Sequence, residues 1–188
     1  MKINAILTGI TMMAGLFASG CANNRDLIAK ASLESRQGVF SEVIGTEAQA
    51  GQTTADIRLS VKRNSSRFMW MYNKHSDPPY RVNLNIDGQT TVLEATPVLE
   101  DKPPIDSSIP ESGIGWRYDF RKVVALAPGK HTLTIAIPID DLIVEHEIDL
   151  RKGTNNISLK PVYKNSSLRP YKGKTFTAGV KTVEVIVH

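Results

Sequence analysis

Apolar and polar residues alternate strictly in several short segments of this chain. The alternation is clearest in residues 55–62 and 80–86, and it places the apolar side chains on one face of an extended strand. The segments with a similar or weaker pattern lie at residues 38–44, 67–72, 89–95, 116–126, 131–137, 142–150, 156–160 and 177–187. No segment has the 3.6-residue period of a convincing long helix. The pattern therefore predicts β-strands throughout.

Turn-forming residues separate these segments. Asp87-Gly88 joins two alternating runs directly and is the strongest short-range signal for a β-hairpin. Pro128-Gly129 and Lys152-Gly153 predict further turns. Residues 96–115 contain four prolines and two glycines, which predicts a long surface loop.

Together these signals predict one all-β domain over residues 38–188. Short alternating strands separated by turns are typical of an antiparallel, immunoglobulin-like β-sandwich, and we expect about seven to nine strands in two sheets. The proline-rich loop at 96–115 interrupts this domain. The chain has a single cysteine, so no intramolecular disulfide supports the fold and its stability must come from its core.

The N-terminal segment has the layout of a secretory signal. Lys2 is its only charge, an apolar run that we expect to be helical extends from Ile3 to Phe17, and the small residues Ala18-Ser19-Gly20 lead into Cys21. Residues 1–20 are thus predicted to be the signal and residues 21–37 a polar tether. A plain secretory signal and a retained transmembrane helix are the alternatives, although the apolar run is short for a membrane span, which needs about 20 residues.

The sequence Ala18-Ser19-Gly20-Cys21 resembles the lipobox of bacterial lipoproteins, with Ala18 at the position where that family most often has leucine. The resemblance implies a diacylglycerol group on the Cys21 sulfur, cleavage just before Cys21, and acylation of the new amino terminus by chains such as palmitate. Several acyl chains would hold the protein stably on a membrane. Ala22 follows the cysteine where an inner-membrane lipoprotein would have aspartate, so the expected location is the outer membrane, facing the periplasm or the cell surface.

A second resemblance covers about half of the predicted domain. Residues 82–88, which end in Ile-Asp-Gly, and residues 126–135, which contain Pro-Gly-Lys-His, are similar to PEGA-type and related immunoglobulin-like domains of bacterial envelope proteins, as are residues 148–150 and 153–159. The resemblance implies a β-sandwich that serves as a scaffold or adhesive module and carries no catalytic residues. The chain also resembles small envelope lipoproteins of unassigned role in environmental Gram-negative bacteria.

The formal net charge of +4 comes from basic and acidic residues that are interspersed along the chain. No cluster of lysines or arginines indicates a nucleic-acid partner. There is also no Gly-x-Ser-x-Gly elbow, Walker loop, Gly-x-Gly-x-x-Gly run or paired-cysteine motif. The sequence therefore predicts a non-enzymatic protein without a cofactor, whose partners are the membrane through Cys21 and an envelope protein or a glycan.

Two groups of residues support other functions. Trp70, Tyr72 and Trp116 are candidate ligand-binding residues, joined by Tyr80, because aromatic rings on a sandwich surface can stack on sugars. Packing in the core is the alternative for them. His75 and His146 are the candidate centres of a divalent-metal module or hydrolase.

The densest group of possible metal ligands is Asp140, Asp141, Glu145, His146 and Glu147. On a strand, Glu145 and Glu147 share one face and His146 takes the other, so the three side chains do not converge. We interpret the group as a solvated strand face and predict no metal site there.

Overall fold

A computed structural model of the protein describes residues 36–43, 51–64, 80–103, 108–169 and 171–188. This part of the chain is built almost entirely of β-strands, which confirms the all-β prediction. Its strands are β1 (Phe40–Glu42), β2 (Thr53–Asn64), β3 (Val82–Ile86), β4 (Gln89–Leu93), β5 (Val98–Glu100), β6 (Gly115–Leu126), β7 (Gly129–Ile137), β8 (Leu142–Leu150), β9 (Thr154–Tyr163), β10 (Asn165–Ser166), β11 (Gly173–Lys174) and β12 (Val180–Val187). Two short 3-10 helices are η2 (Pro138–Asp140) and η3 (Phe176–Ala178).

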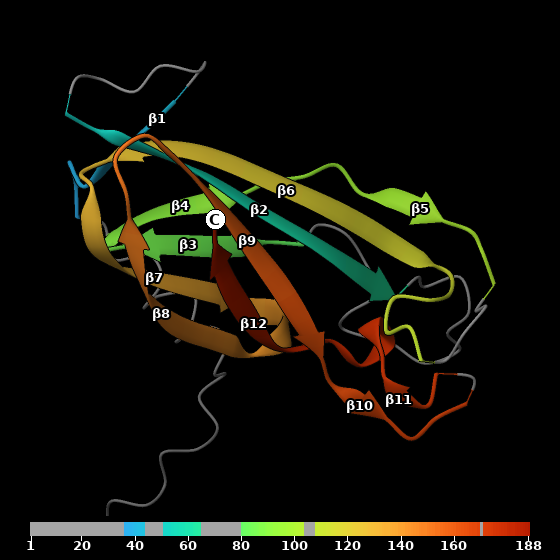
Figure 1. The fold of residues 1–188 in the computed structure, drawn as a ribbon. Helices are drawn as coiled ribbons and strands as arrows, with labels where there is room; N and C mark the ends of the chain where they lie inside the picture. The colour runs from blue at the N-terminus through green and yellow to red at the C-terminus, as the bar shows by residue number, and fades with distance from the viewer. Residues whose placement is uncertain (1–35, 44–50, 65–79, 104–107, 170) are drawn as a thin grey trace, which may run out of the picture.

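The strands form two main sheets that pack face to face (Figure 1). Sheet 1 has the order β1-β6-β2-β9-β12, and β5 pairs with β6 on the same side as β1. Sheet 2 has the order β4-β3-β7-β8, and β10 and β11 form a separate two-stranded hairpin. Figure 1 places β5 and the β10–β11 hairpin at one end of the molecule. The arrangement is sandwich-like, as the sequence predicted.

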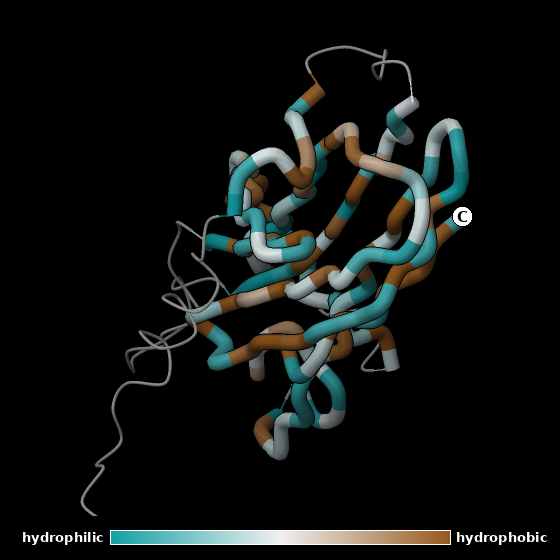
Figure 2. The backbone as a smooth tube through the Cα atoms, turned by 90° about the vertical axis from the view of Figure 1, so that its left-hand side faces the viewer, coloured by the Kyte–Doolittle hydropathy of each residue, from teal (hydrophilic) through white to brown (hydrophobic). Residues whose placement is uncertain are grey.

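The core lies between the two sheets and follows from the two-residue period. In β2 the residues Ala55, Ile57, Leu59 and Val61 face inward and are almost completely buried. Leu84 and Ile135 face them from sheet 2 and are fully buried. Figure 2 shows the resulting alternation of hydrophilic and hydrophobic residues along the strands.

The Asp87-Gly88 hairpin forms as predicted. Asp87 and Gly88 both have positive φ angles, 49° and 93°, which is the backbone of the type I′ turn that matches the twist of a hairpin. The side chain of Asn85 supports the turn by accepting a hydrogen bond of 2.7 Å from the Gly88 N–H. Residues 82–86 and 89–93 consequently pair in register as β3 and β4.

The structure differs from a purely antiparallel sandwich in one strand pair. Residues 54–59 of β2 and 154–159 of β9 run parallel, whereas the other strand pairs in the described ranges are antiparallel. Alternation reveals which face of a strand is buried, but it does not reveal the direction of the neighbour.

The predicted loop at 96–115 also contains regular structure. Residues 98–100 form β5, which pairs with residues 115–117 of β6. Residues 165–166 and 173–174, which lie between the predicted strands at 156–160 and 177–187, form the short β10–β11 hairpin. The predicted signal, most of the tether and the predicted strand at 67–72 lie outside the described residues.

Side chains connect the two sheets along both sides of the sandwich. On one side, the Gln89 amide accepts hydrogen bonds from the N–H groups of Val39 and Phe40 and donates one to the Phe40 carbonyl, so it binds β1 as a backbone strand would. On the other side, His146 of β8 donates a hydrogen bond of 3.0 Å to the Val183 carbonyl of β12. In the ranges that the structure describes, no helix is long and apolar enough to cross a membrane.

Candidate functional site

The predicted site residues fall into two groups. Cys21, Trp70, Tyr72 and His75 lie outside the described residues. Trp116 lies near the start of β6, where it is partly buried and packs against one end of the core.

The other aromatic residues of the described ranges also serve the core. Tyr80 is 4% exposed, and its ring contacts those of Tyr118 and Phe120 at centroid distances of 5.5 and 6.2 Å. Each phenylalanine, tyrosine and tryptophan side chain in residues 36–43, 51–64, 80–103, 108–169 and 171–188 is either buried or, like Trp116 and Tyr171, partly buried. In this part of the protein the aromatic side chains therefore pack mainly against the core.

The acidic and histidine residues at 140–147 are separated in space. Asp140 is buried in the core, whereas Glu147 is exposed and pairs with Lys130 at 2.7 Å. His146 uses its Nε2 atom for the bond to β12. Within the described ranges no three His, Cys, Asp or Glu side chains come together as metal ligands.

A buried charged cluster lies at one end of the sandwich. Asp140 in η2 accepts a hydrogen bond of 3.0 Å from the Tyr80 hydroxyl and lies 3.7 Å from the Arg63 guanidinium. The Arg63 guanidinium also stacks 4.0 Å above the centroid of the Tyr80 ring. Burial and the negative charge of Asp140 raise the pKa of Tyr80 well above its ordinary value, so this hydroxyl remains protonated and donates its hydrogen bond. The cluster joins the end of β2 to the chain that follows β7.

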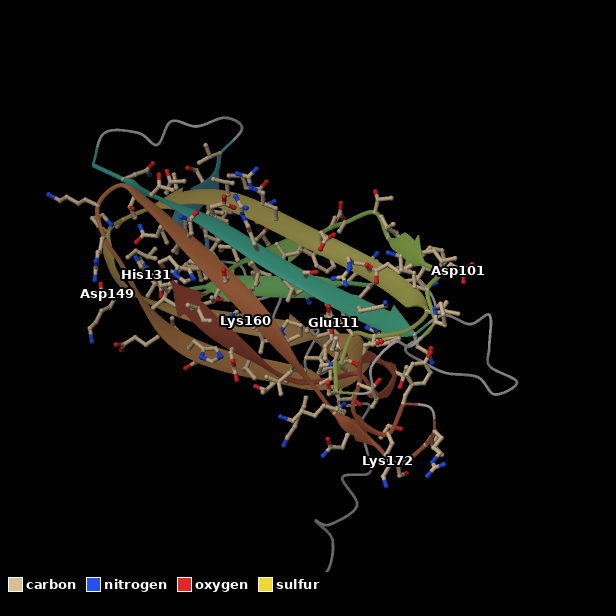
Figure 3. All side chains as sticks on the ribbon, turned by 45° about the vertical axis from the view of Figure 1, so that its right-hand side comes forward. Asp101, Glu111, His131, Asp149, Lys160 and Lys172 are labelled. Carbon is tan, nitrogen blue, oxygen red and sulfur yellow. The ribbon has the colours of Figure 1, made fainter. Side chains whose placement is uncertain are left out.

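A second network covers the outer face of sheet 1 at the same end. Glu100 of β5 binds both Lys62 of β2 and Arg117 of β6, each at 2.5 Å. Glu111 binds Arg117 at 3.2 Å and accepts a hydrogen bond of 2.6 Å from the Tyr163 hydroxyl. Figure 3 shows Glu111 close to the end of β2, with His131 toward the opposite end of the sandwich. These contacts hold β5 and residues 111–117 against the sheet.

A third group lies on the open part of the same face. Arg58 of β2 and Arg121 of β6 are directly opposite each other, and both bind Asp56, at 2.6 and 3.0 Å. The two arginine side chains are about 60% exposed, whereas Asp56 is 7% exposed. Two like charges opposite each other destabilise a sheet, so Asp56 offsets this repulsion.

The acid–base properties of these carboxylates follow from their partners. Hydrogen bonds from Arg58 and Arg121 lower the pKa of Asp56 to about 2, and those from Arg117 and Lys62 lower the pKa of Glu100 to about 2. A general acid or base works best when its pKa lies near the working pH. Asp56 and Glu100 are therefore suited to holding strands together and not to proton transfer at neutral pH.

A shallow depression of about 440 Å³ lies in the surface beside Tyr80. It lies between the start of β3 and the chain that leaves β4, and its lining includes the exposed residues Arg81 and Glu94. Its described lining contains no histidine or cysteine.

The pair formed by Asp87 and His131 was not predicted from the sequence. Asp87 of the β3–β4 turn binds His131 of β7 at 2.6 Å, and His131 also contacts the Ala127 carbonyl at 2.8 Å. Both residues belong to the motifs at 82–88 and 126–135 that carry the resemblance to PEGA-type domains. The joint presence of these two motifs is the feature of the sequence that could have indicated the pair.

The charged side chains of the described residues thus form ion pairs that join neighbouring strands, and no three His, Cys, Asp or Glu side chains of these ranges gather as metal ligands. Comparison of the chain with protein-family models, with curated proteins and with solved structures gives no match.

Proposed function

We propose that this protein is a lipid-anchored, immunoglobulin-like β-sandwich of the bacterial cell envelope that acts by binding or scaffolding and not by catalysis. Cys21 carries the lipid, residues 22–37 form the tether, and the domain lies on the periplasmic or outer side of the outer membrane. Its partner is an envelope protein.

The observation that carries the non-catalytic part of this proposal is the state of the charged groups. The two carboxylates with the most strongly lowered pKa values are Asp56 and Glu100. Each is held between one cationic side chain of β2 and one of β6. These groups lock neighbouring strands together. A sheet whose strands are tied together in this way, with the exposed Arg58 and Arg121 on its outer face, is suited to holding a partner.

The lipid-anchored part rests on the N-terminal sequence. A basic start, an apolar run and Ala18-Ser19-Gly20-Cys21 favour export and acylation. The immunoglobulin-like part is supported by two packed sheets and by the Asp87-Gly88 and Pro128-Gly129 turns.

A glycan or peptidoglycan binder is the second candidate within the same class. Trp70, Tyr72 and Trp116 would be its binding residues. The partly buried position of Trp116 against the core favours the protein partner over the glycan.

The test combines metabolic labelling with a binding assay on the full chain. Cells expressing the wild type or Cys21→Ser are grown with a clickable palmitate analogue and fractionated, and the purified protein is sedimented with peptidoglycan sacculi. We expect label in the wild type only, and we expect the protein to stay in the supernatant. Co-sedimentation that Trp116→Ala abolishes would favour the glycan candidate, and an unlabelled wild type would reject the lipid anchor.

A further inference from the structure

The last strand, β12, forms one edge of sheet 1. Its inner side pairs with β9 in antiparallel register over residues 180–187. On its other side no strand of the described ranges pairs with it; the nearest element there is β8, which packs beside β12 and whose His146 donates a hydrogen bond to the Val183 carbonyl. An unpaired edge presents backbone donors and acceptors to another chain.

The backbone groups that point to this open edge follow from the register. His188 and Asn156 exchange two backbone hydrogen bonds, so His188 and every second residue before it face β9. Val183, Val185 and Val187 consequently point their N–H and C=O groups away from β9. Since His146 occupies the Val183 carbonyl, Val185 and Val187 are the residues whose backbone groups remain for a new strand.

The side chains in this stretch favour pairing. Residues 185–187 are Val-Ile-Val, which have high β propensity, and Val187 is 36% exposed. Natural edge strands are commonly protected by prolines, charges or bulges. Residues 185–187 contain no proline or charge, and the pairing irregularity of β12 lies earlier, between Val180 and Thr182.

We propose that β12 is a dimerisation strand, which pairs antiparallel with β12 of a second copy about a two-fold axis at Ile186. In this register Val185 faces Val187 of the second copy and Val187 faces Val185 of the second copy, so the four available N–H and four available C=O groups form two hydrogen-bonded residue pairs. This goes beyond the proposed function and does not depend on lipidation of Cys21.

The alternative registers fit less well. An axis at Glu184 would place two glutamates side by side and would require the backbone groups of Val183. An axis at Val185 would also require those of Val183, whose carbonyl His146 already occupies. Of these three registers, only the axis at Ile186 uses the unoccupied residues alone.

The same register is self-complementary at the side-chain level. On the outer face of the sheet, Ile186 meets Ile186 of the second copy, and Glu184 lies opposite His188 of the second copy. Apolar pairs across neighbouring strands are stabilising, and the Glu184–His188 pairing keeps the two glutamates of the copies from lying directly opposite each other. Pairing through residues 184–188 also leaves Val183 and its hydrogen bond with His146 outside the new strand pair.

The test is a symmetric cysteine cross-link in the full chain. Ile186→Cys is made in a Cys21→Ser background, so that the introduced thiol is the only one. Residues in a non-hydrogen-bonded antiparallel pair have Cα atoms about 4.5 Å apart, within the range that a disulfide spans. Ser158→Cys is the matched control, because Ser158 is the β9 neighbour of Ile186 and would lie about three strand spacings from its copy.

Mild oxidation is expected to convert Ile186→Cys to a covalent dimer at least about tenfold faster than Ser158→Cys. In sedimentation experiments, Ile186→Lys should raise the dimer dissociation constant about tenfold or more, because two lysines would meet at the axis, whereas Ser158→Lys should not. Circular dichroism checks that each variant is folded. Equal cross-linking of the two cysteine variants, or a wild type that stays monomeric at all concentrations, would overturn the proposal.

Discussion

The imidazole of His131 and the carboxylate of Asp87 lie 2.6 Å apart, although 44 residues separate them in the chain. The second ring nitrogen of His131 contacts the Ala127 carbonyl, and the other carboxylate oxygen of Asp87 accepts a hydrogen bond of 2.8 Å from the Thr132 N–H. Burial opposes ionisation of Asp87, but the hydrogen bonds from Thr132 and His131 outweigh it and lower the Asp87 pKa. The pair thus ties the β3–β4 turn to β7.

Replacing His131 should therefore destabilise the whole domain. We expect His131→Ala to lower the free energy of unfolding by about 2 kcal/mol, because hydrogen bonds to a charged, partly buried group are lost and Asp87 loses a partner. Urea denaturation followed by fluorescence measures this change. Lys130→Ala is the control, since Lys130 pairs with Glu147 where both side chains are about 70% exposed. A loss for His131→Ala no larger than for Lys130→Ala would contradict a structural role for the pair.

Acid should destabilise the protein through Asp56 and Glu100. Their pKa values in the folded protein, about 2, lie below the ordinary values of 3.8 and 4.5. Between these limits the unfolded chain binds more protons than the folded one, so stability is fully present above about pH 5 and falls as the pH drops towards 2.

Asp56→Asn isolates one contribution to this pH dependence. At neutral pH it should cost about 1 kcal/mol, because Arg58 and Arg121 would remain opposite each other without their shared carboxylate. Its stability should also fall less steeply than that of the wild type between pH 4 and pH 2. Thermal melts over that range compare the two proteins, and parallel pH profiles would show that Asp56 is not held as described.

The sandwich core can be tested with two isoleucines on neighbouring strands. Ile135 of β7 is fully buried between the sheets, whereas Ile143 of β8 is 46% exposed. We expect Ile135→Ala to reduce the free energy of unfolding by about 3 kcal/mol and Ile143→Ala by less than about 1 kcal/mol. Similar losses in both variants would mean that the buried face of sheet 2 is assigned wrongly.

Local sequence patterns predicted the strands better than their partners. The hairpin at Asp87-Gly88 was predictable because the turn geometry and the alternation on both sides require only neighbouring residues. The parallel pairing of β2 with β9 joins residues about 100 positions apart, and nothing in either strand specifies the direction of its neighbour. The strand β5 was missed because its three residues lie between prolines in a segment that reads as a loop.

The ion pairs were unpredictable for a similar reason. Lys62 and Glu100 are 38 residues apart, and each belongs to an ordinary polar position of its own segment. Arg63 directly follows the predicted strand at 55–62 and, like Val61, faces the core, where Asp140 supplies its opposite charge. Such pairs depend on the register between distant strands, which periodicity alone does not determine.

The most direct test of the central claim is the intact mass of the protein extracted from membranes, measured beside Cys21→Ser. We predict a mature chain that begins at Cys21 and carries the added mass of a diacylglycerol group, while Cys21→Ser remains uncleaved or is released from the membrane. An unmodified mature chain in the soluble fraction would contradict the lipid anchor and leave a secreted β-sandwich with a free thiol.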